Sequence, residues 1–366
     1  EAGSASLGRR VSAPFGRREA TGFVVGESDS CALPPAQIKR ITRTLDAEPL
    51  FDARSVELAR WLAGMYFCGQ GEALAAMLPS ARSPARASAE RGAAIELEEF
   101  EIELAPLTLS GEQASALERI TREKSGLQYL YGLTGTGKTE VFLQAAEATL
   151  AEGRGVIYLV PEIALTGQVV EAATRRFGEK CAVLHSRLTP AKRLKEWRRI
   201  LRGEATVVVG ARSAVFAPLR ELGLIVIDEE HEATYKSGSA PRYHARQVAM
   251  RRGAVEGARV VMGSATPSVE AWQLMAAGSM GRLPLTRRLA GGAPPEVEIV
   301  DMRLEGGPIS RRLAESVRSS HAEGRQTILF LNRRGFSYFF RCGSCARELR
   351  CPNCSVALTF HKDRNS

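Results

Sequence analysis

The segment GLTGTGKT at residues 132–139 constrains the fold of this chain most. It follows the apolar stretch QYLY, precedes the helix-like stretch EVFLQAA and matches the pattern G-x-x-x-x-G-K-[ST]. Glycines permit a tight turn, and the backbone N–H groups of such a turn and of a helix N-terminus can surround phosphate groups. The segment therefore predicts an α/β domain in which a strand, a phosphate-binding loop and a helix follow one another.

The same loop predicts side chains that bind ATP and Mg²⁺. Lys138 is expected to reach the β- and γ-phosphate oxygens, and the Thr139 hydroxyl is expected to complete the magnesium shell. The loop residues predicted to bind ATP are Gly132, Thr134, Gly135, Thr136, Gly137, Lys138 and Thr139.

A second motif, LGLIVIDEEH at 222–231, ends an apolar strand in three carboxylates and a histidine. Asp228 at the strand end can hold Mg²⁺ through its water shell, and Glu229 can orient or deprotonate an attacking water. Glu230 and His231 have an alternative interpretation as ordinary polar surface residues. The predicted catalytic residues are Lys138, Asp228 and Glu229.

Apolar runs alternate with helix-like stretches through the middle of the chain. Continuous runs of this length are typical of strands that are buried on both faces of a parallel sheet. We therefore expect stacked β-α units of the α/β class. The runs are QYLYGL, GVIYLV, CAVLH, ATVVVG, LGLIVI and ARVVMG.

The flanking segments predict further domains. Residues 7–26 indicate two short strands around a Gly/Arg-rich turn, and 56–67 has the apolar spacing of an amphipathic helix. A stretch rich in Ser, Ala, Arg and Pro indicates a linker, and SRRLAESVRSSHAEG and QTILFLN indicate a later helix and strand. The expected segments are an N-terminal domain (1–82), a linker (83–106), a nucleotide-binding domain (107–290) and the start of another domain (291–366).

Charge and hydropathy limit which ligands the chain can bind and where in the cell it can be located. The net charge is +9, and most of the excess lies between Arg303 and Ser366, which suits a polyanion or a solvated charged surface. The longest apolar runs fall far short of the roughly 18 residues that span a bilayer, so we exclude a membrane partner. The N-terminus lacks the pattern of a secretory signal, which predicts a cytoplasmic location.

Four of the seven cysteines form two short turns, CGSC at 342–345 and CPNC at 351–354. Such paired turns are typical of zinc sites, although only five residues separate Cys345 from Cys351, fewer than one closed four-cysteine site normally has. A redox role for the thiols is the alternative. The predicted zinc ligands are Cys342, Cys345, Cys351 and Cys354.

The order of these motifs resembles a known family. The phosphate loop, DEEH and GSATPS (263–268) together resemble superfamily 2 helicases, which are motors built from two RecA-like domains. Longer tracts narrow the resemblance to the primosomal replication-restart helicases. These tracts are LVPEIALTGQ (159–168), LHSRLTPAKRLKEWRRI (184–200), VVGARSAVFAPLRELGLIVIDEEHEATYK (208–236), PRYHAR (241–246) and FLNRRGF (330–336).

The resemblance implies a RecA-like parallel-sheet motor domain, preceded by a small β-rich DNA-binding domain and followed by the start of a second motor domain that carries the zinc-binding turns. It implies an ATP-dependent DNA helicase or translocase of replication restart. The expected cofactors are ATP, Mg²⁺ and Zn²⁺, with each cysteine pair forming half of a site. The expected partners are single-stranded and forked DNA and the primosome and replisome-loading proteins, which places the protein at the nucleoid.

The resemblance also assigns individual residues. Gln113 falls where such motors recognise adenine, and Tyr235 and Tyr243 belong to an aromatic-rich loop on which DNA bases can stack. Ser264 and Thr266 fall in the motif that couples hydrolysis to movement. The residues implied in DNA binding or coupling are Pro161, Thr166, Gln168, Arg212, Ser213, His231, Tyr235, Arg242, Tyr243, Ser264 and Thr266.

Several parts of the family pattern are not found in this sequence. The opening strands of the N-terminal domain, the winged-helix domain and the motif that supplies an arginine to the γ-phosphate have no counterpart, so we expect a fragment or a truncated product with impaired turnover. Two alternatives remain: an ATP- and DNA-binding module with little turnover, and a fork-reversal or repair translocase of the same superfamily.

Overall fold

The computed structural model describes residues 5–79, 108–161, 167–186, 188–289, 291, 295–305, 307, 309–330 and 345. The chain divides into two compact units, residues 1–292 and 293–366. The predicted linker at 83–106 lies outside the described residues, and the four-segment division stays a prediction.

The first unit begins with a small antiparallel sheet. Its strands β1 (Arg10–Phe15), β2 (Arg18–Phe23) and β3 (Arg43–Thr44) are ordered β2-β1-β3, which confirms the predicted pair of strands. Helices α1 (Ala53–Tyr66) and α2 (Gln70–Met77) follow. Asp52 is the N-cap of α1, because its side chain accepts a hydrogen bond from the Ser55 N–H. The predicted amphipathic helix is thereby confirmed.

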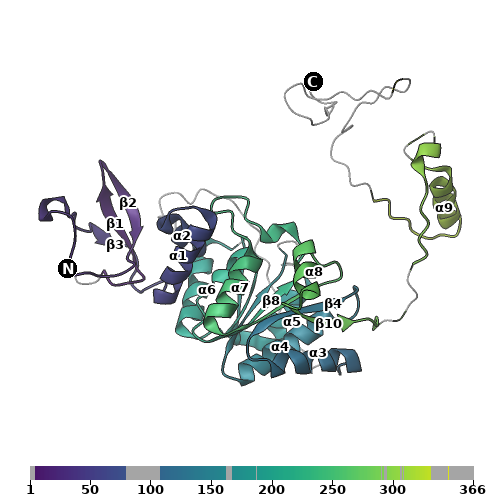
Figure 1. Cartoon of the computed structure of the whole chain (residues 1–366), viewed down its shortest axis with the longest axis horizontal. Helices are drawn as coiled ribbons and strands as arrows, with labels where there is room; N and C mark the ends of the chain where they lie inside the picture. The colour runs from purple at the N-terminus through teal and green to yellow at the C-terminus, as the bar shows by residue number, and fades with distance from the viewer. Residues whose placement is uncertain are drawn as a thin grey trace. The chain divides into compact units, whose positions relative to one another are not determined.

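A seven-stranded sheet forms the centre of the first unit (Figure 1). All of its strand pairs are parallel, and their order is β10-β4-β9-β8-β5-β7-β6. All six apolar runs predicted as strands are confirmed. The strands are β4 (Gly126–Gly132), β5 (Gly155–Leu159), β6 (Cys181–Leu184), β7 (Val207–Gly210), β8 (Leu222–Asp228), β9 (Arg259–Ser264) and β10 (Gly281–Leu285).

Helices cover both faces of this sheet (Figure 1). One apolar core joins α3, α4 and α5 to one face, and a second joins α1, α2, α6 and α7 to the other. This confirms a RecA-like α/β domain preceded by a small antiparallel-sheet domain. The helices are α3 (Gly111–Arg122), α4 (Lys138–Ala151), α5 (Gln168–Phe177), α6 (Pro190–Arg202), α7 (Ala245–Glu256) and α8 (Val269–Ala276).

Two elements differ from the sequence prediction. Strand β10, GRLPL, was not predicted, because its alternation is short and contains a proline; as an edge strand, it tolerates the missing N–H of Pro284. The predicted strand QTILFLN is wrong where the structure describes it, since 326–330 form no strand. The later helix is confirmed as α9 (Arg311–Ala322) in the second unit.

Candidate functional site

Three neighbouring strands bring the sequence motifs together. Strands β4, β9 and β8 lie side by side, and in a parallel sheet their carboxyl ends meet at one edge. The phosphate loop follows β4, Ser264 ends β9 and Asp228 ends β8. The predicted phosphate and acidic motifs are therefore placed at one site by the strand order.

The phosphate loop has the backbone that its glycines predict. Gly135 and Gly137 have φ values of 83° and 75°, in the left-handed region that glycine adopts most readily, and α4 begins directly afterwards at Lys138. The Lys138 Nζ donates to the carbonyl oxygens of Gly132 at 2.8 Å and Leu133 at 3.3 Å. The buried ammonium therefore lies folded against the loop that is predicted to surround phosphate.

Asp228 and Lys138 lie in the same site. The buried Asp228 carboxylate accepts hydrogen bonds from the Tyr158 hydroxyl at 3.2 Å and the Glu229 N–H at 3.0 Å, and the Thr139 side chain also hydrogen-bonds Tyr158. Burial and the Glu229 charge raise the pKa of Asp228 to about 6, although attraction to Lys138 opposes this shift. A divalent cation fits beside this carboxylate, because its charge would offset both the loss of solvation on burial and the repulsion from Glu229.

The raised pKa of Asp228 predicts a pH-dependent gain in stability for Asp228→Asn. The folded chain binds this proton more tightly than the unfolded chain, so the carboxylate costs stability above about pH 6, and this cost fades as the pH falls towards 4. In the absence of metal and nucleotide, we expect Asp228→Asn to unfold at higher urea than the wild type at pH 8. We expect the two midpoints to converge only as the pH falls to about 4. An equal difference at both pH values would contradict the shift.

Ser264 joins the acidic motif to the segment after β9. Its hydroxyl donates to Glu229 Oε2 at 3.0 Å, lies 2.6 Å from His231 Nδ1 and accepts from the Thr266 N–H at 3.0 Å. The four residues that were predicted separately for catalysis and coupling therefore form one hydrogen-bond network. Ser264 hydrogen-bonds both the Glu229 side chain and the Thr266 N–H, so a movement of Glu229 can displace the backbone at 264–266.

Glu230 is not a surface residue, contrary to the alternative interpretation from sequence. It is 1% exposed and forms an ion pair with Arg246. Tyr129 donates to Oε2 at 3.2 Å, and the Ser268 hydroxyl donates to Oε1 at 2.7 Å. Sequence reasoning missed Arg246, because its carboxylate partner lies on another element. Together the pair fixes the start of α8 beside the acidic motif.

The Gln113 amide is occupied within the protein. It is 2% exposed; its Oε1 accepts from the Ser110 N–H at 2.8 Å, and its Nε2 donates to the Thr136 carbonyl at 3.0 Å. The amide thus caps α3 and holds the phosphate loop. Bidentate bonding to adenine, as the resemblance implied, does not fit this arrangement unless these bonds are released.

Base stacking on Tyr235 and Tyr243 does not fit the structure either. The two side chains are 1% and 4% exposed, and the Tyr243 ring packs edge-on against Phe216 at 4.8 Å between centroids. The Tyr235 hydroxyl donates to the Asp228 carbonyl at 2.6 Å. Both rings therefore hold the loop in place, whereas Arg242 is exposed.

A groove of about 470 Å³ lies beyond the carboxyl ends of β5, β7 and β6. Its lining includes Ser213, Arg212 and Arg193, with part of α2 on one side. Arg212 donates to the carbonyls of Thr234 and Lys236, and Arg193 donates to that of His185; within the described part of the chain neither arginine forms an ion pair. Burial lowers the pKa of Arg193. The two arginines therefore offer positive charge to an anionic ligand, and the Glu72 carboxylate of α2 lines the same groove.

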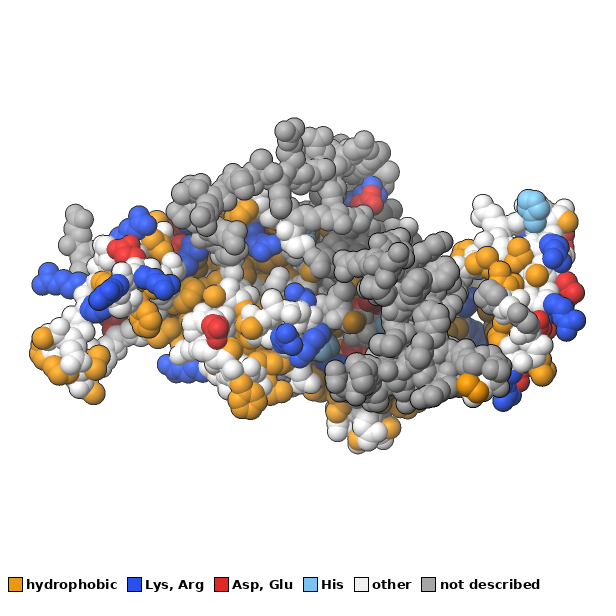
Figure 2. Space-filling model, turned by 90° about the horizontal axis from the view of Figure 1, so that it is seen from above, with side chains coloured by type: hydrophobic (Ala, Val, Ile, Leu, Met, Phe, Trp, Pro, Cys, Tyr) orange, Lys and Arg blue, Asp and Glu red, His pale blue; other side chains and the backbone are white. Residues whose placement is uncertain are grey.

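The remaining residues predicted to contact DNA differ in their exposure. Pro161 is buried, Gln168 is exposed at the start of α5, and Thr166 lies outside the described residues. Basic side chains also gather over the N-terminal sheet, at the left of Figure 2. The exposed basic residues there are Arg17, Arg18, Lys39, Arg40 and Arg43.

The zinc prediction is not tested by the structure. Cys342, Cys351 and Cys354 lie outside the described residues, and Cys345 is exposed. Over the described ranges, no group of three or more His, Cys, Asp or Glu residues is arranged to hold a metal ion. In the same ranges no helix is long and apolar enough to cross a membrane.

Two family matches cover most of the first unit. Residues 1–79 match the PriA 3′ DNA-binding domain, and residues 110–274 match the DEAD/DEAH box helicase domain. The second match contains the phosphate loop, the acidic motif and the groove arginines.

The curated relatives of this chain include two replication restart proteins. The replication restart protein PriA of Treponema pallidum (strain Nichols) is 51% identical over 99% of this chain and 55% of its own length. That of Bacillus subtilis (strain 168) is 44% identical over 70% of this chain and 33% of its own length. RecG bound to a three-way DNA junction is 22% identical, with a TM-score of 0.40 over 60% of this chain and 29% of that one.

The chain spans about half or less of the length of these curated relatives. On these matches, the chain belongs to the family of the replication restart protein PriA, of which it carries the 3′ DNA-binding domain and the DEAD/DEAH box helicase domain.

Proposed function

We propose that the chain is the DNA-dependent ATPase part of a helicase that moves along single-stranded DNA and unwinds forked DNA in replication restart. The observation that carries this proposal is the sheet edge, where Lys138 and Asp228 share one site and the groove arginines follow two further strands of the same sheet, Arg193 in α6 after β6 and Arg212 directly after β7. ATP and Mg²⁺ are the proposed cofactors. Zinc, primosome and replisome-loading partners, and a location at the nucleoid follow from the family resemblance.

The residues of the sheet edge fit an ATP-hydrolysing site. Lys138 would exchange its two carbonyl acceptors for β- and γ-phosphate oxygens, and the loop N–H groups would bind the same phosphates. Thr139 and Asp228 would hold Mg²⁺, which supplies neutralisation of charge on the transferred phosphoryl group. Glu229 would accept a proton from, or orient, the attacking water.

The groove residues fit a single strand that is read by its backbone. Arg193 and Arg212 bring positive charge to the groove, and Ser213 is an exposed hydroxyl beside them. Such groups bind phosphates without distinguishing bases. Tyr235 lines the groove and donates to the Asp228 carbonyl, which connects this side of the sheet with the acidic motif. Strand binding and nucleotide hydrolysis can therefore influence each other.

Replacing Lys138 by alanine should weaken ATP binding and suppress hydrolysis, because the substitution removes a buried cation next to the phosphate site. We expect at least a tenfold weaker affinity for a fluorescent ATP analogue, an effect of about 1.4 kcal/mol. The matched control is Lys124→Ala, since the exposed Lys124 pairs with Glu152 away from the loop. Equal ATP affinity in wild type and Lys138→Ala would contradict the assignment.

The proposal as a whole is tested by steady-state ATPase assays with and without single-stranded DNA. Stimulation by DNA is the expected result, and unchanged turnover with bound DNA would exclude a translocase. A nucleotide- and DNA-binding module with little turnover is the second candidate, because the chain matches only 55% of its Treponema relative. Hydrolysis by this chain at a rate comparable with that of a complete relative would exclude the second candidate.

A further inference from the structure

Tyr66, the last residue of α1, contacts the loop that follows the acidic motif. Its hydroxyl accepts a hydrogen bond from the His244 N–H at 3.0 Å, and the Lys236 ammonium lies 5.2 Å from its ring centroid. Lys236 and His244 form an isolated antiparallel bridge, which closes the neck of this loop. Tyr66, a side chain of the 3′ DNA-binding domain, therefore contacts both residues of the neck, Lys236 and His244.

The neck is in turn connected to the predicted magnesium carboxylate. Tyr235 precedes Lys236, is buried, and donates from its hydroxyl to the Asp228 carbonyl. Arg212, which lines the groove, donates to the carbonyls of Thr234 and Lys236 at 3.0 and 2.8 Å. A buried ring has little room to move, so displacement of the neck shifts the Asp228 backbone or breaks its bond to Tyr235.

We propose that Tyr66 is a positioning residue that couples DNA binding by the N-terminal domain to nucleotide binding at the sheet edge. This inference rests on the proposed function, since it requires that the chain binds both ligands. A DNA strand that is bound by both the N-terminal domain and the groove can change the conformation of the neck through two contacts, one with Tyr66 and one with Arg212. Coupling of this kind is a free energy between two sites, and it acts equally in both directions.

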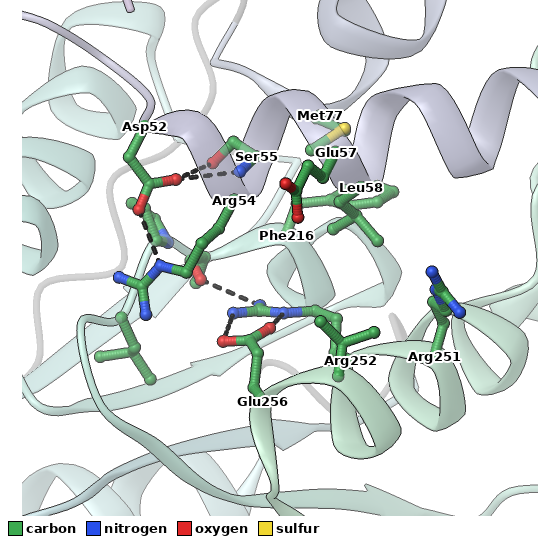
Figure 3. A pocket seen from close by; sticks show the side chains of 14 residues that line it. Asp52, Arg54, Ser55, Glu57, Leu58, Met77, Phe216, Arg251, Arg252 and Glu256 are labelled. Carbon is green, nitrogen blue, oxygen red and sulfur yellow. Dashed lines mark hydrogen bonds and ion pairs between the residues drawn. The ribbon is translucent and has the colours of Figure 1, made fainter.

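A different contact of the same helix provides a matched control. Arg54 near the start of α1 donates to the Arg220 carbonyl at 2.6 Å. It lies beside a small cavity between α1 and α7, where Arg252 pairs with Glu256 (Figure 3). Arg54 thus joins the N-terminal domain to the helicase domain without contacting the neck. Loss of this contact loosens the same interface and leaves the route through Tyr66 intact.

The test compares Tyr66→Phe and Lys236→Met with the control Arg54→Met. Phenylalanine keeps the ring and removes the hydroxyl acceptor, whereas methionine at 236 keeps the chain length and removes the cation. The affinity of a fluorescent, non-hydrolysable ATP analogue with Mg²⁺ is measured with and without saturating oligothymidylate. The reciprocal titration measures oligothymidylate affinity with and without the analogue. Neither titration requires turnover.

In the wild type, we expect each ligand to change the affinity of the other by about 5- to 150-fold, the usual range for coupled sites. Tyr66→Phe and Lys236→Met should bring this factor towards one, with the affinity for each ligand alone changed less than about twofold. Arg54→Met should keep the wild-type factor.

Four results would overturn the inference. Wild-type coupling that persists in Tyr66→Phe, or no coupling in the wild type, would remove Tyr66 from this role while the binding of both ligands leaves the proposed function standing. An equal loss in Arg54→Met would show general loosening of the interface. Failure of the wild type to bind either ligand would contradict the proposed function and this inference together.

Discussion

Glutamine in place of Glu229 should leave ATP bound and lower turnover by about 10²- to 10⁴-fold, the usual contribution of a positioned general base. The amide keeps the size of the side chain and can still accept the Ser264 hydrogen bond, which is 3.0 Å long in the structure. It cannot accept a proton from water. Binding of a fluorescent ATP analogue and steady-state ATP hydrolysis with single-stranded DNA measure the two effects separately.

Glu232→Gln is the control for this substitution, because Glu232 lies on the same turn and its carboxylate lies 3.9 Å from His231 Nε2, the ring nitrogen that does not contact Ser264. It should retain wild-type turnover. Trapped ATP in Glu229→Gln with normal hydrolysis in Glu232→Gln would identify Glu229 as the base. Normal turnover in Glu229→Gln would contradict this role. Another group would then activate the water, and the only role left for Glu229 would be its hydrogen bond with Ser264.

The phosphate loop and the acidic motif could be found from sequence because each is a short, continuous pattern next to an apolar strand. Their predicted chemistry depends on local backbone, such as the positive φ of Gly135 and Gly137. The strand order could not be read in the same way. The sheet places β9 between β4 and β8, so Ser264 separates the two motifs in space while it follows both in sequence.

Residues whose partners are remote in sequence were assigned less well. Tyr235 and Tyr243 look like ligand-stacking rings in an isolated tract, but tertiary packing buries them. Gln113 looks free to recognise a base, whereas the loop 23 residues later occupies its amide. A motif reports which residue types are present; burial and competing hydrogen bonds decide whether a side chain is available. The contact between Tyr66 and the loop neck likewise has no signal in the sequence.

Among the substitutions considered, we expect the largest loss of folding stability when the buried ion pair of Glu230 and Arg246 is broken. Replacing Arg246 by methionine should lower the free energy of unfolding of the first unit by about 3–5 kcal/mol, because Glu230 would stay buried without its cation. Urea unfolding measures this loss. The exposed pair of Arg202 and Glu48 is the control, and Arg202→Met should leave the urea midpoint nearly unchanged, because exposed ion pairs contribute little to stability.

A double variant separates the cost of an unpaired charge from the value of the pair itself. Adding Glu230→Gln to Arg246→Met removes the buried charge while the amide oxygen can still accept from Tyr129 or Ser268. The double variant should therefore be more stable than Arg246→Met alone, as expected when desolvation of a lone charge dominates. If the two variants unfold at the same urea concentration, the loss comes from the hydrogen bond that Arg246 donates to Ser268 rather than from the charge of Glu230.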